Sequence, residues 1–166
     1  MAAPNQLKEV LVTQKFTLRC RVCHGVIGQP YISLDRQTQR YGTRMWQGQR
    51  QGTITTLNCQ EMFRYDSQNC RALHEPQIVA ELKLKTTHPG AEPVTPCSRC
   101  AAPIDRTLPH VSYNYLEGEM TDWTITNITD STELAVLCRD CEEPDAPATQ
   151  TAVAAATVDQ PERSRA

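Results

Sequence analysis

Residues 97–100 read Cys-Ser-Arg-Cys and residues 138–141 read Cys-Arg-Asp-Cys, with 37 residues between the two motifs. Two C-x-x-C motifs separated by a few tens of residues form the usual four-thiolate cage of structural zinc. A third motif, Cys-Arg-Val-Cys at residues 20–23, lies in the first half of the chain and is followed by Cys59 and Cys70. The eight cysteines of this 166-residue chain therefore predict two zinc sites.

The predicted ligands of the second site are Cys97, Cys100, Cys138 and Cys141, and those of the first are Cys20, Cys23, Cys59 and Cys70. The first half has Met62 where the second has Cys141, so its fourth ligand has to come from further along the chain. Cys70 is the first choice. His74 is the reserve, because residues i and i+4 of a helix share one face.

Other residues repeat between the halves with the same spacing. Ile27 and Ile104 each lie four residues after a C-x-x-C motif, and Trp46 and Trp123 each lie 23 residues after one. This pattern predicts an internal duplication of a unit of about 50 residues, too short to hold a core without metal. The cysteine pairs resemble the general class of zinc-ribbon and zinc-knuckle modules, with the tryptophan as the main apolar filler of each.

The expected fold is a small, metal-stabilised, β-rich protein with a minor α content, built from two tandem zinc-ribbon-like modules. Module 1 covers residues 1–87, a linker rich in proline and glycine covers 88–96, module 2 covers 97–141, and 142–166 forms a tail. The tail lacks aromatic residues and is rich in Ala, Thr and Pro, a composition typical of disorder.

Within the modules, alternating and β-branched segments predict strands, listed as 31–34, 53–59, 110–115, 123–129 and 133–138. Residues 35–52 are polar and predict a hairpin or loop between two of these strands. A short helix is expected around 67–74. Residues 75–87 fit either a helix or a strand, because a proline at a helix start is followed by alternating residues.

Charge divides the chain. Residues 1–86 carry 12 Lys and Arg against 6 Asp and Glu, whereas the remainder carries 5 against 13. Four arginines of the first half lie in the 35–52 segment among glutamines and aromatic residues. The predicted contact residues of this segment are Arg36, Arg40, Arg44, Arg50, Tyr41 and Trp46. Arginine, amide and ring groups together are suited to nucleic acid, whose phosphates, base edges and base faces they contact. A solvated hairpin, or one that docks on the acidic second module of the same chain, is the alternative.

No catalytic motif occurs in the chain, and a four-thiolate zinc site has no open position for substrate. We therefore expect a non-enzymatic, zinc-binding protein that acts by binding, with nucleic acid on module 1 and a protein on module 2 in a regulatory role. A protein–protein adaptor or inhibitor and a thiol redox switch are the alternatives. No membrane span or export signal is recognisable, which predicts a cytoplasmic location.

Overall fold

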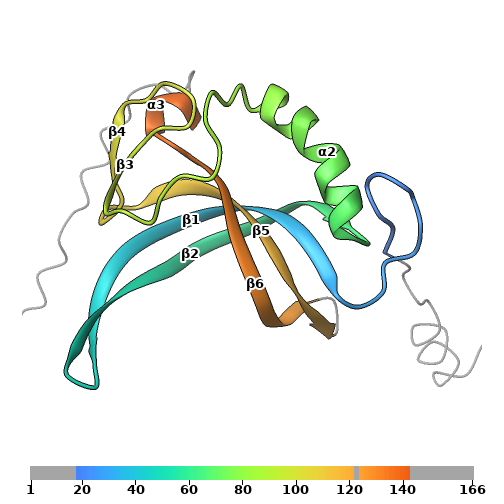
Figure 1. The fold of residues 1–166 in the computed structure, drawn as a ribbon, viewed down its shortest axis with the longest axis horizontal. Coiled ribbons are helices and arrows are strands. Elements are labelled where there is room, and N and C mark those ends of the chain that lie inside the picture. The colour runs from blue at the N-terminus through green and yellow to red at the C-terminus, as the bar shows by residue number, and fades with distance from the viewer. Residues whose placement is uncertain (1–17, 122–123, 143–166) are drawn as a thin grey trace, which may run out of the picture.

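The computed structural model describes residues 18–121 and 124–142 and is mostly β, with few helices. Two antiparallel hairpins build one four-stranded sheet in the order β2-β1-β5-β6 (Figure 1). The first hairpin consists of β1 (Tyr31–Trp46) and β2 (Gln49–Tyr65), and the second of β5 (His110–Thr121) and β6 (Thr124–Leu137). The predicted β-rich class with minor α content is confirmed.

The two halves of the chain share this sheet. β1 pairs with β5 in antiparallel register from Tyr31 opposite Gly118 to Gln39 opposite His110. The 35–52 segment, predicted as a hairpin or loop between short strands, is itself the body of the long β1–β2 hairpin. Tyr41, Thr43 and Trp46 in the segment and the β-branched run 53–56 after it explain this, because aromatic and β-branched residues favour strands.

The two C-x-x-C turns have the same backbone geometry. The residue before each motif pairs with the residue three places after it, Arg19 with Val26 and Pro96 with Pro103; the latter pair belongs to the short strands β3 (Val94–Pro96) and β4 (Pro103–Asp105). In both turns the residue after the second cysteine has a positive φ, 61° at His24 and 65° at Ala101.

One face of the sheet carries the apolar core. Ile32 and Leu34 of β1 and Tyr115 of β5 are buried on this face together with Tyr65 of β2. Helix α2 (Gln68–Glu81) packs here, with its Ile78 buried. Full burial of such side chains contributes about 1.5–3 kcal/mol each, so this face holds the helix against the sheet.

Helix α2 begins after Ser67, whose side chain accepts a hydrogen bond from the Cys70 amide and so caps the first turn. The helix runs on to Glu81 with Pro76 inside it. Residues 75–81, for which the sequence left helix and strand open, are therefore helical. A second, short helix, α3 (Arg139–Glu142), follows β6 and includes Glu142, which the sequence had placed in the tail; residues 143–166 lie outside the described part.

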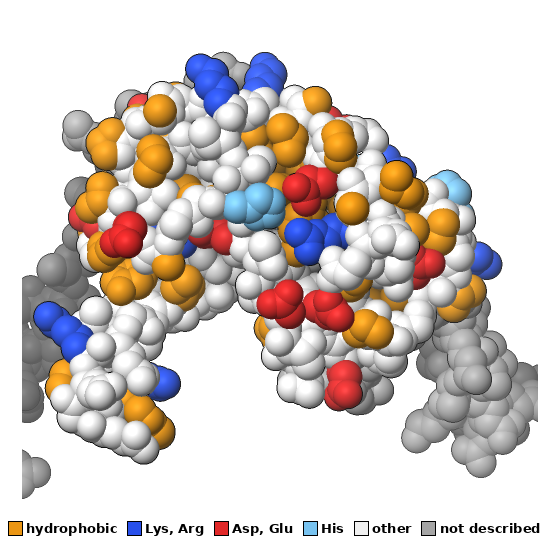
Figure 2. Space-filling view, in the orientation of Figure 1, with side chains coloured by type: hydrophobic (Ala, Val, Ile, Leu, Met, Phe, Trp, Pro, Cys, Tyr) orange, Lys and Arg blue, Asp and Glu red, His pale blue; other side chains and the backbone are white. Residues whose placement is uncertain are grey.

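The far ends of the two hairpins project from the body and differ in charge. Lys and Arg side chains lie near the end of the β1–β2 hairpin, and Asp and Glu side chains near the end of the β5–β6 hairpin (Figure 2). We call residues 40–55, the projecting part of the first hairpin, the arm. None of the described helices has the length and apolar character needed to cross a membrane.

Candidate metal centres and the basic arm

The second cysteine cluster assembles as the sequence predicts. The ligand atoms of Cys97, Cys100, Cys138 and Cys141 all lie within 4.8 Å of one another. The first pair comes from the turn between β3 and β4, and the second pair from the start of α3, directly after β6. Cys97 is buried and Cys100 is exposed, so the cluster lies at the edge of the body beside α3, at the upper left of Figure 1.

The first cluster lies at the other end of the sheet, beside the start of α2. It brings together Cys20, Cys23, Asp66 and Cys70, whose ligand atoms again lie within 4.8 Å of one another. The Cys23 thiol donates to Asp66 Oδ2 at 3.1 Å. Three of the four predicted ligands therefore meet, and Asp66 is a member that sequence reasoning missed.

Cys59 does not reach this cluster. β2 continues six residues beyond Cys59, to Tyr65, so Cys59 lies in the middle of a strand, opposite Gln37. Its thiol donates instead to Asp35 Oδ2 at 3.1 Å. His74, the reserve ligand, also lies elsewhere: it is buried, and its Nδ1 is 2.9 Å from the Tyr65 hydroxyl.

Two equivalent backbone hydrogen bonds, one at each cluster, show which ligands of the two clusters correspond. The amide after the first cysteine of each turn donates to the carbonyl two residues before the third ligand: Arg21 to Arg64 at 2.9 Å, and Ser98 to Val136 at 2.8 Å. Asp66 therefore occupies the place of Cys138. A ligand between the end of a strand and the start of a helix is the signal that could have identified it, because Ser67 already marks the helix start.

Within each cluster the cysteine pKa values differ, and one cysteine ionises more readily than the others. Burial opposes ionisation of Cys97, but the backbone amides of Cys100, Cys138 and Arg99 donate to its sulfur and lower its pKa to about 6. Burial and hydrogen bonds that the Cys141 thiol donates to the neighbouring sulfurs raise the pKa of Cys141 to about 12. Without a cation, four close sulfurs cannot all ionise, and a bound metal ion is what stabilises the fully deprotonated set.

The donor sets fit a metal ion. Sulfur ligands from two C-x-x-C motifs select soft or borderline cations, and three sulfurs with one carboxylate oxygen remain within that range. In the first cluster Asp66 Oδ1 is buried without a hydrogen-bond partner, as expected of an oxygen that a cation would neutralise. Both clusters can therefore hold a metal ion.

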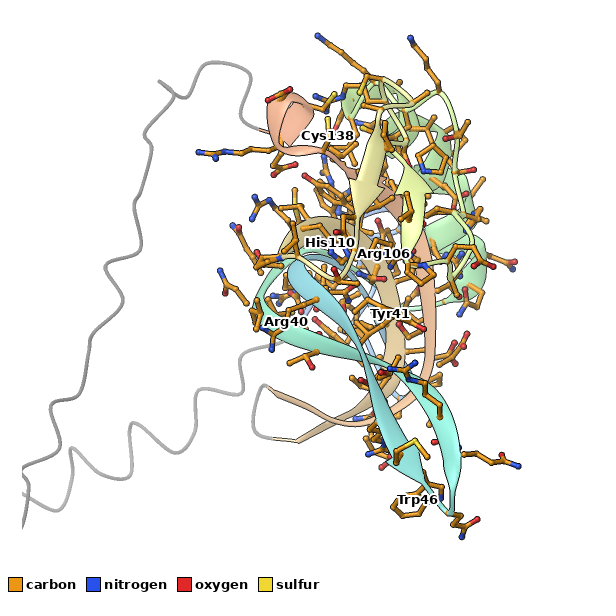
Figure 3. The ribbon with its side chains drawn as sticks, turned by 90° about the vertical axis from the view of Figure 1, so that its left-hand side faces the viewer. Arg40, Tyr41, Trp46, Arg106, His110 and Cys138 are labelled. Carbon is orange, nitrogen blue, oxygen red and sulfur yellow. The ribbon has the colours of Figure 1, made fainter. Side chains whose placement is uncertain are left out.

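The arm presents three of the four predicted arginines to solvent. Arg40, Arg44 and Arg50 are exposed, and no carboxylate of the described residues forms an ion pair with them. Residues 36–60 contain no Asp or Glu at all. The positive charge of the arm is thus uncompensated locally. Figure 3 shows the arm, with Arg40 near the body and Trp46 at the tip.

Two of the predicted contact residues, Arg36 and Tyr41, make contacts within the fold. Arg36 forms an ion pair with Glu142 of α3 and is only partly exposed, so it ties the sheet to the second cluster. The Tyr41 hydroxyl would lie 2.5 Å from a Cβ placed on Gly52. The ring of Tyr41 therefore covers a glycine across the hairpin, an arrangement that stiffens the arm.

Trp46 lies at the tip of the arm with 52% of its surface exposed. The prediction that it fills the core of module 1 is wrong, because the hairpin carries it away from the body. The guanidinium carbon of Arg44 lies 5.4 Å from its ring centroid, which holds the ring and the charge together. Trp123, its predicted counterpart, is outside the described residues.

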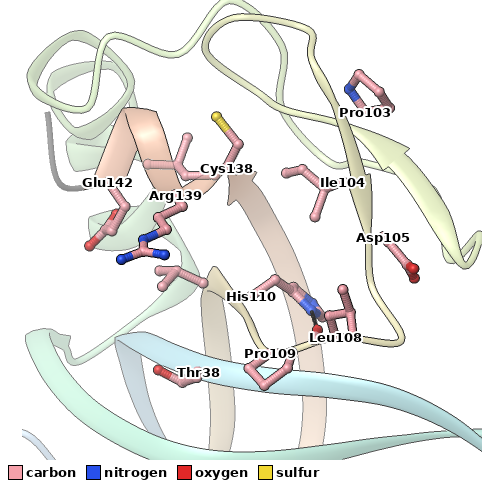
Figure 4. A pocket seen from close by; sticks show the side chains of 12 residues that line it. Thr38, Pro103, Ile104, Asp105, Leu108, Pro109, His110, Cys138, Arg139 and Glu142 are labelled. Carbon is pink, nitrogen blue, oxygen red and sulfur yellow. Dashed lines mark hydrogen bonds between the residues drawn. The ribbon is translucent and has the colours of Figure 1, made fainter. Parts of the chain in front are cut away.

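A cavity of about 470 Å³ lies beside the second cluster, between β4 and α3 (Figure 4). Two of its polar side chains, His110 and Asp105, have partners within the fold. His110 lies 3.0 Å from the Leu108 carbonyl through Nδ1 and accepts from Arg106 through Nε2. Asp105 accepts from Thr107.

Comparisons with protein-family models, with curated proteins and with solved structures found no match to this chain.

Proposed function

We propose that this is a non-catalytic protein, stabilised by two zinc ions, that binds nucleic acid through its β1–β2 arm. The observation that carries the proposal is the projecting arm, which has no acidic residue and exposes Arg40, Arg44, Arg50 and, at its tip, Trp46. A two-stranded β-ribbon fits the major groove of duplex DNA, and exposed rings stack on the bases of single strands.

Zinc is proposed because sulfur-dominated, tetrahedral sites are its usual structural sites. A non-catalytic role is supported by the hydrogen bonds of His110 and Asp105 in the cavity beside Cys138 and by the state of Cys59. Burial and the adjacent Asp35 raise the pKa of Cys59 to about 11, so it is a protonated thiol at neutral pH. The matching geometry of the two C-x-x-C turns supports the further proposal that the halves arose by duplication.

The test is the salt dependence of binding by the full-length, zinc-loaded protein. Fluorescence anisotropy with single- and double-stranded oligonucleotides, between about 50 and 200 mM salt, gives the slope of log K against log salt. Three arginine contacts predict a slope of about −2 to −3, and Arg40→Ala or Arg44→Ala each reduces it by about 0.7–0.9. Arg139→Ala is the control, because Arg139 is equally exposed but lies on α3. Absence of salt-dependent binding at low salt contradicts the proposal.

A protein-binding role is the second candidate, because the arm also exposes apolar side chains. Met45 and Ile54 are 66% and 53% exposed, and single exposed patches of this kind serve as protein contacts. In that case Trp46→Ala and Ile54→Ser abolish binding to a partner, while Arg40→Ala changes mainly the association rate. The acidic end of the β5–β6 hairpin is the proposed protein contact of the second half.

A further inference from the structure

The sheet face opposite the apolar core is lined by buried polar side chains. On β1, Ser33, Asp35, Gln37 and Gln39 follow one another at alternate positions, and each is at most 5% exposed. Ser112 and Asn114 continue the row on β5, where they pair opposite Gln37 and Asp35. Buried polar groups are normally fully hydrogen-bonded, so an exception on this face is informative.

Three side-chain oxygens on this face are buried without a hydrogen-bond partner, namely Ser33 Oγ, Asp35 Oδ1 and Gln39 Oε1. Gln39 is the one of these three residues that lines a cavity. Its Nε2 donates to Gln37 Oε1 at 2.6 Å, and Asn114 Nδ2 donates to the same oxygen at 3.2 Å. Gln37 Nε2 in turn donates to Cys59 Sγ at 3.7 Å. This chain of donors fixes the orientation of both glutamine amides. It leaves Gln39 Oε1 buried without a partner and one of the two Nε2 hydrogens of Gln39 free.

Gln39 lines a cavity of about 370 Å³ to which all four strands contribute. This volume is at the small end of the range for ligand sites. Apolar side chains form part of the wall, listed as Ile54, Leu116, Ile128 and Pro89. The charges in the wall are paired, because Arg106 Nη2 lies 2.7 Å from Glu133 Oε1. The cavity therefore suits a small, uncharged, planar group with polar edges.

We propose that this cavity binds a nucleobase that presents an amino group beside a ring nitrogen, with adenine as the best match. A glutamine amide pairs with adenine through two hydrogen bonds, one accepted by the oxygen and one donated by the nitrogen. In Gln39 the amide oxygen is free to accept a hydrogen bond and one amide hydrogen is free to donate one. The hydrogen bond to Gln37 holds both groups in place. The base can come from a free nucleoside or from a nucleic-acid strand bound by the arm, and only the second source rests on the proposed function.

The experiment titrates adenosine and inosine into the full-length, zinc-loaded protein, followed by calorimetry or by amide chemical shifts. Inosine lacks the amino group that Gln39 Oε1 would accept from. Adenosine is expected to bind about tenfold more tightly than inosine, within the discrimination of one bidentate amide pair. Gln39→Leu should remove this difference. Gln49→Leu is the matched control, because Gln49 lies exposed at the hairpin turn. Thermal melts and metal content establish that both variants fold.

Oligonucleotides separate the two sources of the base. Preference for oligo-adenine over an abasic strand, lost in Gln39→Leu but kept in Arg40→Ala, assigns the cavity to a strand on the arm. Adenosine binding with no such preference assigns it to a free nucleoside, and that result stands even if the arm binds no nucleic acid. If adenosine and inosine bind equally, or neither binds at millimolar concentration, the proposal is overturned.

Discussion

The first and second cysteine clusters are built on the same backbone frame but differ in one ligand. Each has a C-x-x-C turn clamped to a long strand by one amide, and each takes its last two ligands from the junction of that strand with a helix. The second cluster has Cys138 at this junction, and the first has Asp66. The difference teaches that a ligand's position follows the ends of secondary structure more closely than it follows spacing along the chain.

The misplaced ligand shows this directly. Cys59 and Cys138 lie at nearly equal distances from the preceding C-x-x-C motif, 36 and 38 residues after it. β2, however, runs to Tyr65, because the strands of the first hairpin have 16 and 17 residues and those of the second have 12 and 14. The longer hairpin returns to the body later, so equal spacing in sequence does not give equal depth in the sheet.

The largest expected effect comes from replacing one cysteine of the second cluster, which has four sulfur ligands. The comparison is with Cys59, which belongs to neither cluster. Cys138→Ser should lose one metal ion and unfold the second half, because structural zinc contributes on the order of 10 kcal/mol to modules of this size. Cys59→Ser should keep both metal ions. Metal analysis and thermal melts measure this, and a cooperative melt with two metal ions in Cys138→Ser would contradict it.

The second prediction concerns the buried charges, which also differ between the halves. Arg106, 1% exposed, is paired with Glu133 and donates to the Gly90 carbonyl. Arg106→Met should lower the free energy of unfolding by about 3–5 kcal/mol, because it leaves Glu133 without its cation. The double variant Arg106→Met/Glu133→Leu should recover most of this loss in denaturant titrations. If the double variant is as unstable as the single one, the hydrogen bond to the Gly90 carbonyl contributes more to stability than the Arg106–Glu133 ion pair does.

The third prediction is the order of metal loss. A chelator should strip the first cluster before the second, because a carboxylate replaces one thiolate there. Cys23 and Cys100 are both exposed, so their alkylation rates compare the clusters fairly, and Cys23 should react first. Asp66→Cys should slow loss of the first metal by about tenfold, equivalent to ~1.4 kcal/mol. Simultaneous loss in the wild type would contradict a weaker first site.

Much of the fold is readable from local patterns, and the rest depends on long-range pairing. The C-x-x-C turns, the β-rich class and the helix near residue 70 are predictable because each depends on a few neighbouring residues. The shared sheet is not, because the pairing of β1 with β5 joins residues about 80 positions apart. The same holds for the exposure of Trp46, since only the length of the hairpin decides whether its tip reaches the core.

The smallest expected effect concerns a difference between the two central strands, β1 and β5. Asp35 of β1 lies opposite Asn114 of β5, and burial raises the pKa of Asp35 despite the hydrogen bond from Cys59. The folded state therefore binds more protons than the unfolded chain once the pH exceeds about 3.8, and its stability falls as the pH rises toward the folded pKa. Asp35→Asn makes the two positions alike. It should remove this slope and stabilise the fold at neutral pH by on the order of 1 kcal/mol. Denaturant titrations across the acid range measure it, and Asp105→Asn, an exposed acid on β4, is the control. An unchanged slope would mean that water or another cation compensates Asp35.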